Sequence, residues 1–174
     1  MVDGREAELI ERARMGFELA YAELVTPLLP AAARFAYGLL HDRCDAEDSV
    51  QEAALLGWQR LANLEPGRSF RPWFLGIVAN RCRERVRAHW WTVIRMPDLG
   101  GAGSHEGDWL QGADLRRALA RLPHPQRAAI VLHFYLDLPL EEVAATLGLG
   151  IAGVKARINR GLRRLRVALA AEER

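Results

Sequence analysis

Basic side chains stand in two separate blocks of the sequence, and the chemistry that they suggest is the neutralisation of phosphate. Between residues 68 and 95 there are seven arginines and one acid, Glu84, and between residues 154 and 167 there are six basic residues and no acid. The stretch between the blocks, residues 97–114, carries no base and four acids, Asp98, Glu106, Asp108 and Asp114. Because nucleic-acid affinity comes largely from phosphate contacts, two basic blocks predict two contacts with a polyanion. The alternative is that each block is only the solvated face of a helix.

No set of residues typical of catalysis or metal binding stands out. The sequence contains no Gly-rich phosphate loop, no H-E-x-x-H and no G-x-S-x-G. Its five histidines are scattered, and His41 with Cys44 is a lone pair that lacks two further ligands for zinc. We therefore expect a binding protein with no enzymatic activity, no cofactor, no metal and no small-molecule substrate.

Length and composition restrict the class of protein further. A chain of 174 residues accommodates one domain or two small ones. No stretch approaches the roughly 18 consecutive apolar residues of a membrane span, and the first residues lack the pattern of a signal peptide. Cys44 and Cys82 are far apart and form no CxxC, which argues against a disulfide framework. The expected setting is reduced and cytoplasmic, with no direct membrane insertion.

Helical patterns flank a glycine-rich stretch, and no alternating strand is found. We predict an all-α fold of two small helical domains, residues 1–95 and 114–174, joined by a flexible acidic linker at 96–113. In the first domain, Pro27 and Pro30 should break or bend the apolar stretch 17–40.

Capping residues mark the expected starts of two further helices. Asp45 should cap one helix with its carboxylate, and Ser69 should cap a long helix from Phe70 to about Trp90. On the long helix, helical spacing assigns a core side to Val78, Cys82, Val86 and His89. It assigns the opposite side to Trp73, Asn80, Arg83, Glu84 and Arg87.

The second domain has the sequence form of a helix-turn-helix. A short helix over residues 139–149 contains Gly148 near its end, and an amphipathic helix follows. The apolar stripe of this second helix consists of Ile151, Val154, Ile158, Leu162, Leu165 and Leu169. In such motifs the N-terminal part of the second helix enters the major groove. Lys155 and Arg157 are therefore the best candidates for base contacts, and the later arginines are better placed for phosphate contacts.

These motifs, in this order, resemble a bacterial extracytoplasmic-function (ECF) sigma factor of the sigma-70 family, a class that retains only regions 2 and 4. Residues 45–53, DAEDSVQEA, with Trp58 are similar to the family's A-E-D-x-V-Q-E…W stretch, and residues 70–81 resemble its F-R-x-W-L…A-x-N segment. Its region-4 pattern is matched by residues 122–127 and 141–157. Gly150 and Gly153 depart from the family, which often has Ser and Thr there.

The resemblance implies binding to core RNA polymerase and to a two-element promoter, which the protein helps to melt. It implies polymerase contacts by Asp45, Asp48, Gln51, Glu52 and Trp58. It implies contacts to the −10 element by Arg68, Trp73, Asn80, Arg83 and Arg87, and a flipped base would enter a pocket formed partly by loop 63–69. Trp73 is at least as well suited to core packing as to stacking. Contacts to the −35 element would come from Lys155, Arg157, Asn159, Arg160 and Arg164.

The resemblance also implies a role for the linker and a regulatory partner. The acidic linker would thread through the active-site cleft of the polymerase, and the alternative is a plain tether. An anti-sigma factor, often membrane-bound, would hold the two domains inactive, so that signal sensing lies outside this polypeptide. The rival hypothesis is a helix-turn-helix regulator that binds DNA without polymerase, but it leaves residues 45–52 and the first basic block unexplained.

Overall fold

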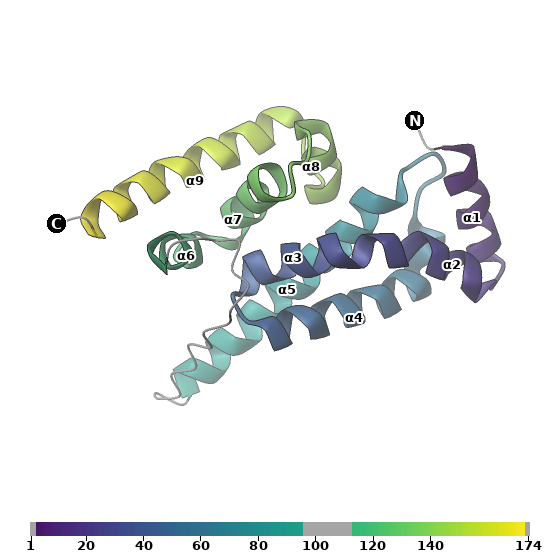
Figure 1. Cartoon of the computed structure of the whole chain (residues 1–174), viewed down its shortest axis with the longest axis horizontal. Helices are drawn as coiled ribbons and strands as arrows, with labels where there is room; N and C mark the ends of the chain where they lie inside the picture. Colours follow the sequence, from purple (N-terminus) through teal and green to yellow (C-terminus); the bar gives the residue numbers. More distant parts are fainter. Residues whose placement is uncertain (1–2, 96–112, 173–174) are drawn as a thin grey trace.

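Two groups of helices make up the part of the chain that the structure, a computed structural model, describes: residues 3–95 and 113–172 (Figure 1). The N-terminal group contains α1 (Gly4–Arg14), α2 (Glu18–Val25), η1 (Thr26–Leu28), α3 (Leu29–Leu40), α4 (Arg43–Arg60), η2 (Leu61–Asn63) and α5 (Phe70–Arg95). The C-terminal group contains α6 (Ala113–Ala120), α7 (His124–Ile130), the π-helical η3 (Val131–Tyr135), α8 (Leu140–Leu147) and α9 (Ile151–Glu172). These ranges hold no strand, and the all-α prediction is confirmed.

None of the described helices combines the length and the apolar character that crossing a membrane requires. Residues 96–112 of the predicted linker lie outside the described residues, while Ala113 already begins α6.

The two prolines divide the apolar stretch, as predicted. Pro27 lies in η1, and Pro30 occupies the first turn of α3, where the missing backbone donor costs no helical hydrogen bond. A short 3-10 turn therefore separates α2 from α3, and the backbone stays in the right-handed helical region across it. His41 ends α3 in the left-handed conformation, with φ of 56°.

The helix that carries the first motif begins earlier than predicted. Asp42 is the N-cap of α4, because its Oδ1 accepts a hydrogen bond from the amide of Asp45 at 2.8 Å. The prediction that Asp45 is the cap was wrong. Asp45 lies in the first turn, where its carboxylate accepts a hydrogen bond from Arg85 of α5 instead.

The cap predicted for α5 also comes from another residue. Glu6 of α1 accepts a hydrogen bond from the amide of Phe70 at 2.7 Å, and the Ser69 hydroxyl donates to the same carboxylate oxygen at 3.1 Å. Ser69 is thus a donor to the capping group and is not the cap itself. From Phe70 the helix runs beyond Trp90, to Arg95.

Helices α3, α4 and α5 pack against one another, and α1 and α2 close one end of this group (Figure 1). The inner face of α5 buries Val78 and Cys82 completely, as predicted, together with Phe70, Phe74 and Leu75. Val86 is only half-buried, and the side chain of His89 lies outside the described residues.

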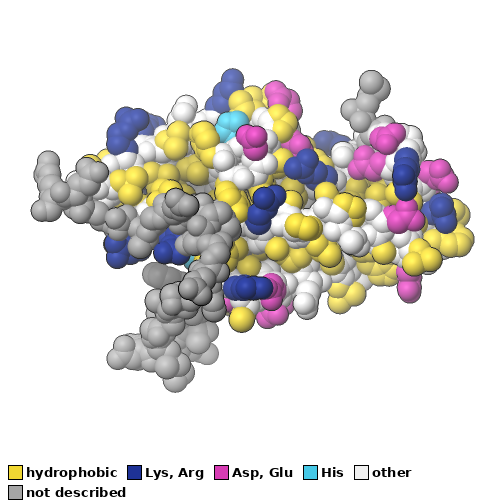
Figure 2. All heavy atoms as spheres, in the orientation of Figure 1, with side chains coloured by type: hydrophobic (Ala, Val, Ile, Leu, Met, Phe, Trp, Pro, Cys, Tyr) yellow, Lys and Arg dark blue, Asp and Glu magenta, His cyan; other side chains and the backbone are white. Residues whose placement is uncertain are grey.

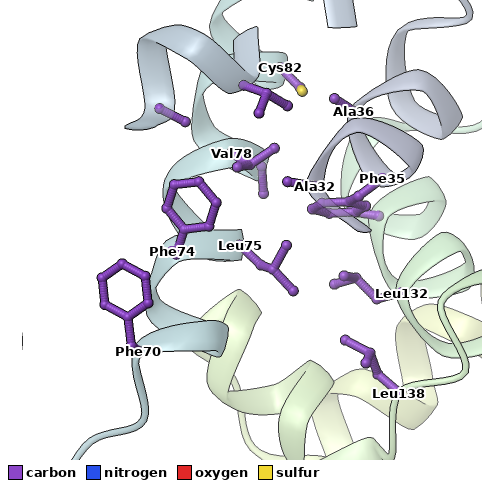
Figure 3. Close-up of a cluster of buried hydrophobic side chains, with 14 of the residues drawn as sticks. Ala32, Phe35, Ala36, Phe70, Phe74, Leu75, Val78, Cys82, Leu132 and Leu138 are labelled. Carbon is purple, nitrogen blue, oxygen red and sulfur yellow. The ribbon is translucent and has the colours of Figure 1, made fainter. Parts of the chain in front are cut away.

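The two groups of helices share one hydrophobic core. Leu132 and Leu138 of the C-terminal group are buried with Phe35 of α3 and Leu75 of α5 (Figure 3). Helices α5 and α8 approach closely at Gly76, where a Cβ would stand 2.9 Å from the carbonyl oxygen of Thr146. A side chain at this position would push the two groups apart.

Candidate nucleic-acid interface

The helix-turn-helix is formed by α8 and α9. Gly148 ends α8 with φ of 63°, a conformation that glycine adopts without steric cost, and α9 starts at Ile151. Val154, Ile158 and Leu165 of the predicted stripe are buried, but Ile151 and Leu162 are 39% and 37% exposed.

Gly161 explains the exposure of Leu162. A Cβ on Gly161 would stand 2.5 Å from Cδ1 of Ile130, so α7 packs directly on the backbone of α9 at this point. The inward face therefore runs from Ile158 through Gly161 to Leu165, which leaves Leu162 at its edge.

The outer face of α9 is basic and carries most of the residues predicted to contact the −35 element. Lys155, Asn159, Arg160 and Arg164 are exposed, and Arg157 is half-buried. The ion pairs found among the described residues involve none of the six basic side chains of α9. These charges are therefore available to a polyanion.

The outer face of α5 carries the residues predicted to contact the −10 element. Asn80, Arg83 and Arg87 are exposed. Trp73 is half-buried and packs against Phe70, with 5.6 Å between ring centroids, so packing accounts for part of its surface.

One cleft brings residues of both predicted DNA surfaces together. It has a volume of about 380 Å³ and lies between α5 and the helices α7, α8 and α9. Its walls include Trp73, Asn80 and Arg83 from α5 and Arg157 from α9. Arg68, Arg87 and the remaining α9 residues of the prediction lie elsewhere on the surface.

All three carboxylates predicted to contact polymerase form a cluster with arginines of α5. Arg85 contacts Asp45 at 2.8 Å, Asp48 at 3.4 Å and Glu52 at 2.7 Å. The hydrogen bond from Arg85 to Asp45 raises the pKa of the guanidinium. Arg81 adds a weaker contact with Glu52 at 3.7 Å. This cluster fastens α4 to α5, and it therefore has a structural role of its own.

The remaining polymerase candidates differ in exposure. Gln51 is exposed, whereas Trp58 is half-buried against Tyr21, with 5.2 Å between ring centroids. Leu55 was missed by the sequence analysis, although it is 60% exposed and lies one helical turn after Gln51. The sequence did contain a signal for Leu55: it stands four positions after Gln51, and residues four apart lie side by side on the surface of a helix.

The loop before α5 is short and well anchored. Arg68 contacts Glu65 at 3.0 Å, and Gly67 has φ of 78°, a conformation that favours glycine. Both Arg68 and Glu65 are exposed, so the tip of the loop is accessible.

A buried guanidinium links the two groups of helices. Arg127 of α7 is 8% exposed and donates to the carbonyl of Leu39 at the end of α3, as well as to those of Ala120 and Leu122.

Burial and the nearby positive charge of Arg127 lower the pKa of His41 and of His124 to about 4. Both imidazoles are thus neutral at neutral pH.

Comparisons with known proteins match both groups of helices. The family description Sigma-70 region 2 matches residues 24–92, and the description Sigma-70, region 4 matches residues 113–165. The ECF RNA polymerase sigma factor RpoE of Cereibacter sphaeroides is 32% identical over 158 residues, which cover 86% of this chain and 86% of RpoE. The chain belongs to the ECF sigma factors of the sigma-70 family. Sigma factors of this family are non-catalytic factors of transcription initiation.

Two further proteins place this ECF sigma factor among its relatives. The ECF RNA polymerase sigma factor SigE of Mycolicibacterium smegmatis is 36% identical over 161 residues; these cover 87% of the chain but only 62% of SigE, so the chain spans less than two thirds of that relative. The sigma factor RpoE from Bartonella quintana, solved in complex with the anti-sigma factor NepR, superposes with a TM-score of 0.70 and 27% identity. That alignment covers 86% of this chain and 96% of the solved one.

Proposed function

We propose that this chain binds core RNA polymerase and directs it to promoters that have a −10 and a −35 element, where it assists melting. The observation that carries the proposal is the presence of regions 2 and 4, in this order, on one chain. We assign residues 1–95 to a region-2 domain, 96–113 to an acidic linker and 114–174 to a region-4 domain. The chemistry of RNA synthesis belongs to the polymerase, and the chain itself has no enzymatic activity.

The polymerase contact is assigned to the outer face of α4. Gln51, Glu52 and Leu55 lie there next to one another and are exposed, a combination of apolar and polar groups that suits a protein interface. Asp45, Asp48 and Glu52 have a double role, since they also hold Arg85. Trp58 is half-buried next to this face and packs against Tyr21.

The −35 contact is assigned to the basic face of α9, which forms no ion pair with another described residue. The −10 contact is assigned to Asn80, Arg83 and Arg87 of α5 with Arg68 of the preceding loop. The cleft between the two surfaces has the size of a small-molecule pocket, and a double helix does not enter it. Regions 2 and 4 must therefore separate before Asn80 and Arg157 both reach DNA.

The regulatory partner is assigned to the class of anti-sigma factors. A relative with the same fold, RpoE from Bartonella quintana, is in complex with the anti-sigma factor NepR. We place the chain in the cytoplasm, where RNA polymerase and the chromosome are, and an anti-sigma factor anchored in the membrane would hold it there until released. The complex isolated from cells should not support transcription until the partner is removed.

Run-off transcription with core polymerase on genomic fragments tests the proposed function. The expected result is a set of discrete promoter-specific transcripts that core polymerase alone does not make. Gln51→Ala should weaken core binding about tenfold, as loss of a central interface contact does. Gln59→Ala, an exposed glutamine two turns further along α4, is the matched control and should leave core binding unchanged. Absence of any specific transcript, together with DNA footprints by the chain alone, would contradict the proposal.

A further inference from the structure

The loop between η2 and α5, residues 64–69, is held at both ends by α1. At its first end, the Arg14 guanidinium donates to the carbonyl of Leu64. At its last end, Glu6 accepts hydrogen bonds from the Ser69 hydroxyl at 3.1 Å and from the Phe70 amide at 2.7 Å. Two charged side chains from one helix thus fix the points at which the loop starts and stops.

Between these points the loop is exposed. Leu64 and Phe70 are buried, with 2% and 1% of their surface accessible, and they anchor the ends in the core. Residues 65–68 lie outside, and the amide of Arg68 donates to the carbonyl of Glu65 at 3.1 Å to close a tight turn. The loop is therefore an accessible tip on two fixed supports, and displacement of either support would move the tip.

Helix α1 is itself rigidly placed, and the end of the molecule that it forms with α2 carries a net negative charge. Ile10 and Ala13 are buried in the core, with 6% and 3% of their surface accessible. Helices α1 and α2 carry five glutamates and three arginines, and acidic side chains with some basic ones among them lie at this end of the molecule (Figure 2). The resulting net negative charge disfavours phosphate, since like charges repel. An effect of α1 on DNA is therefore expected through the loop.

We propose that α1 is a positioning element for promoter recognition, in which Glu6 and Arg14 hold loop 64–69 where it receives an unpaired base of the −10 element. This inference rests on the proposed function. The region-2 match begins at residue 24, so α1 (Gly4–Arg14) lies outside the matched part of the chain. The carboxylate of Glu6 also faces the positive end of the α5 dipole, which favours its hydrogen bonds to the first turn.

The test compares Glu6→Ala with Glu8→Ala in the full chain bound to core polymerase. The probe is a forked promoter fragment with a single-stranded −10 element, in two forms: the native sequence, and the same sequence with the flipped base replaced by an abasic site. Glu8 is exposed on the same helix and is the matched control. We expect Glu6→Ala to reduce the preference for the native form over the abasic form about tenfold. Core binding and binding to a duplex −35 fragment should not change, and Glu8→Ala should behave as the wild type.

A rescue variant separates positioning from a general loss of structure. The amide oxygen of Glu6→Gln can still accept a hydrogen bond from the Phe70 amide, so the base preference should recover in part. Arg68→Ala should lower the preference less when Glu6 is already Ala, because both act through the same loop. An unchanged base preference in Glu6→Ala, or equal losses for core, −35 and −10 binding, would overturn the inference. If the wild type neither binds core nor distinguishes the two probes, it is the proposed function that fails.

Discussion

Helices α5 and α9 carry comparable runs of arginine, but the structure uses the two sets of charges differently. On α5, Arg71 pairs with Glu142 at 3.1 Å, Arg81 pairs with Glu84, and Arg85 pairs with three carboxylates of α4. On α9, none of the six basic side chains takes part in an ion pair with another described residue. The first set mainly holds helices together, and the second set faces outward.

This difference shows that the density of charge along a sequence does not measure the charge available for binding. Within the part of α5 whose side chains the structure describes, Arg83 and Arg87 are exposed and form no ion pair with another described residue, so they are its arginines available to phosphate. We therefore expect α9 to supply most of the salt-dependent affinity for DNA, and α5 to contribute through position and shape.

The largest expected effect concerns His41 and His124, the two histidines near the buried guanidinium of Arg127. His41 and His124 have pKa values lowered from 6.5 to about 4, because burial and the charge of Arg127 disfavour protonation. The unfolded chain binds protons at pH 6.5 and the folded chain does not, so stability is lost as the pH falls from 6.5 towards 4. The loss should reach about 3 kcal/mol per histidine at most.

Urea unfolding at a series of pH values measures this loss. The variant with His41→Asn and His124→Gln should show a flatter dependence between pH 6.5 and 4, and Asn at position 41 tolerates the left-handed conformation there. A wild-type curve as flat as that of the double variant would show that the imidazoles are not held neutral by the fold.

The second effect contrasts a buried arginine with an exposed one. Arg127→Met removes the donor for three backbone carbonyls, those of Leu39, Ala120 and Leu122, and should lower the free energy of unfolding by about 3 kcal/mol. Arg160→Met, on the exposed face of α9, should change it by less than about 0.5 kcal/mol. Chemical denaturation of both variants checks the contrast. Equal stabilities would mean that the cost of burying the guanidinium cancels its hydrogen bonds.

Features governed by neighbouring residues were predicted correctly from the sequence. The break at Pro27 and Pro30 follows from the missing amide of proline, and the turn at Gly148 follows from the freedom of glycine. The burial of Val78 and Cys82 follows from helical spacing alone. Each of these depends on interactions within one or two turns of the chain.

Features governed by distant residues were not predicted. Asp42 and Asp45 are both suitable caps, and the presence of Arg85 on another helix engages the second one. The amide of Phe70 is capped by Glu6, which is remote in sequence. Single-sequence patterns contain no information on which distant helix will approach, so such partners become visible only in the folded chain.

The smallest effect tests the comparison of α5 and α9 directly, by making the same substitution on each helix. Arg85→Ala leaves Asp45, Asp48 and Glu52 close together without their shared cation, and should lower the free energy of unfolding by about 1 kcal/mol. Arg164→Ala removes an exposed cation that pairs with no described carboxylate, and should change stability by less than about 0.5 kcal/mol.

In DNA binding, Arg164→Ala should have the larger effect of the two variants. For holoenzyme on a duplex −35 fragment, Arg164→Ala should reduce the slope of log K against log salt by about 1, because one phosphate contact is lost. Arg85→Ala should leave that slope unchanged, since its guanidinium faces carboxylates of α4. Denaturation gives the free energy of unfolding of each variant, and the salt titration gives the slope for each. A reduced slope in Arg85→Ala would mean that this arginine contacts DNA despite its ion pairs. A loss of stability in Arg164→Ala would mean that the outer face of α9 also stabilises the fold.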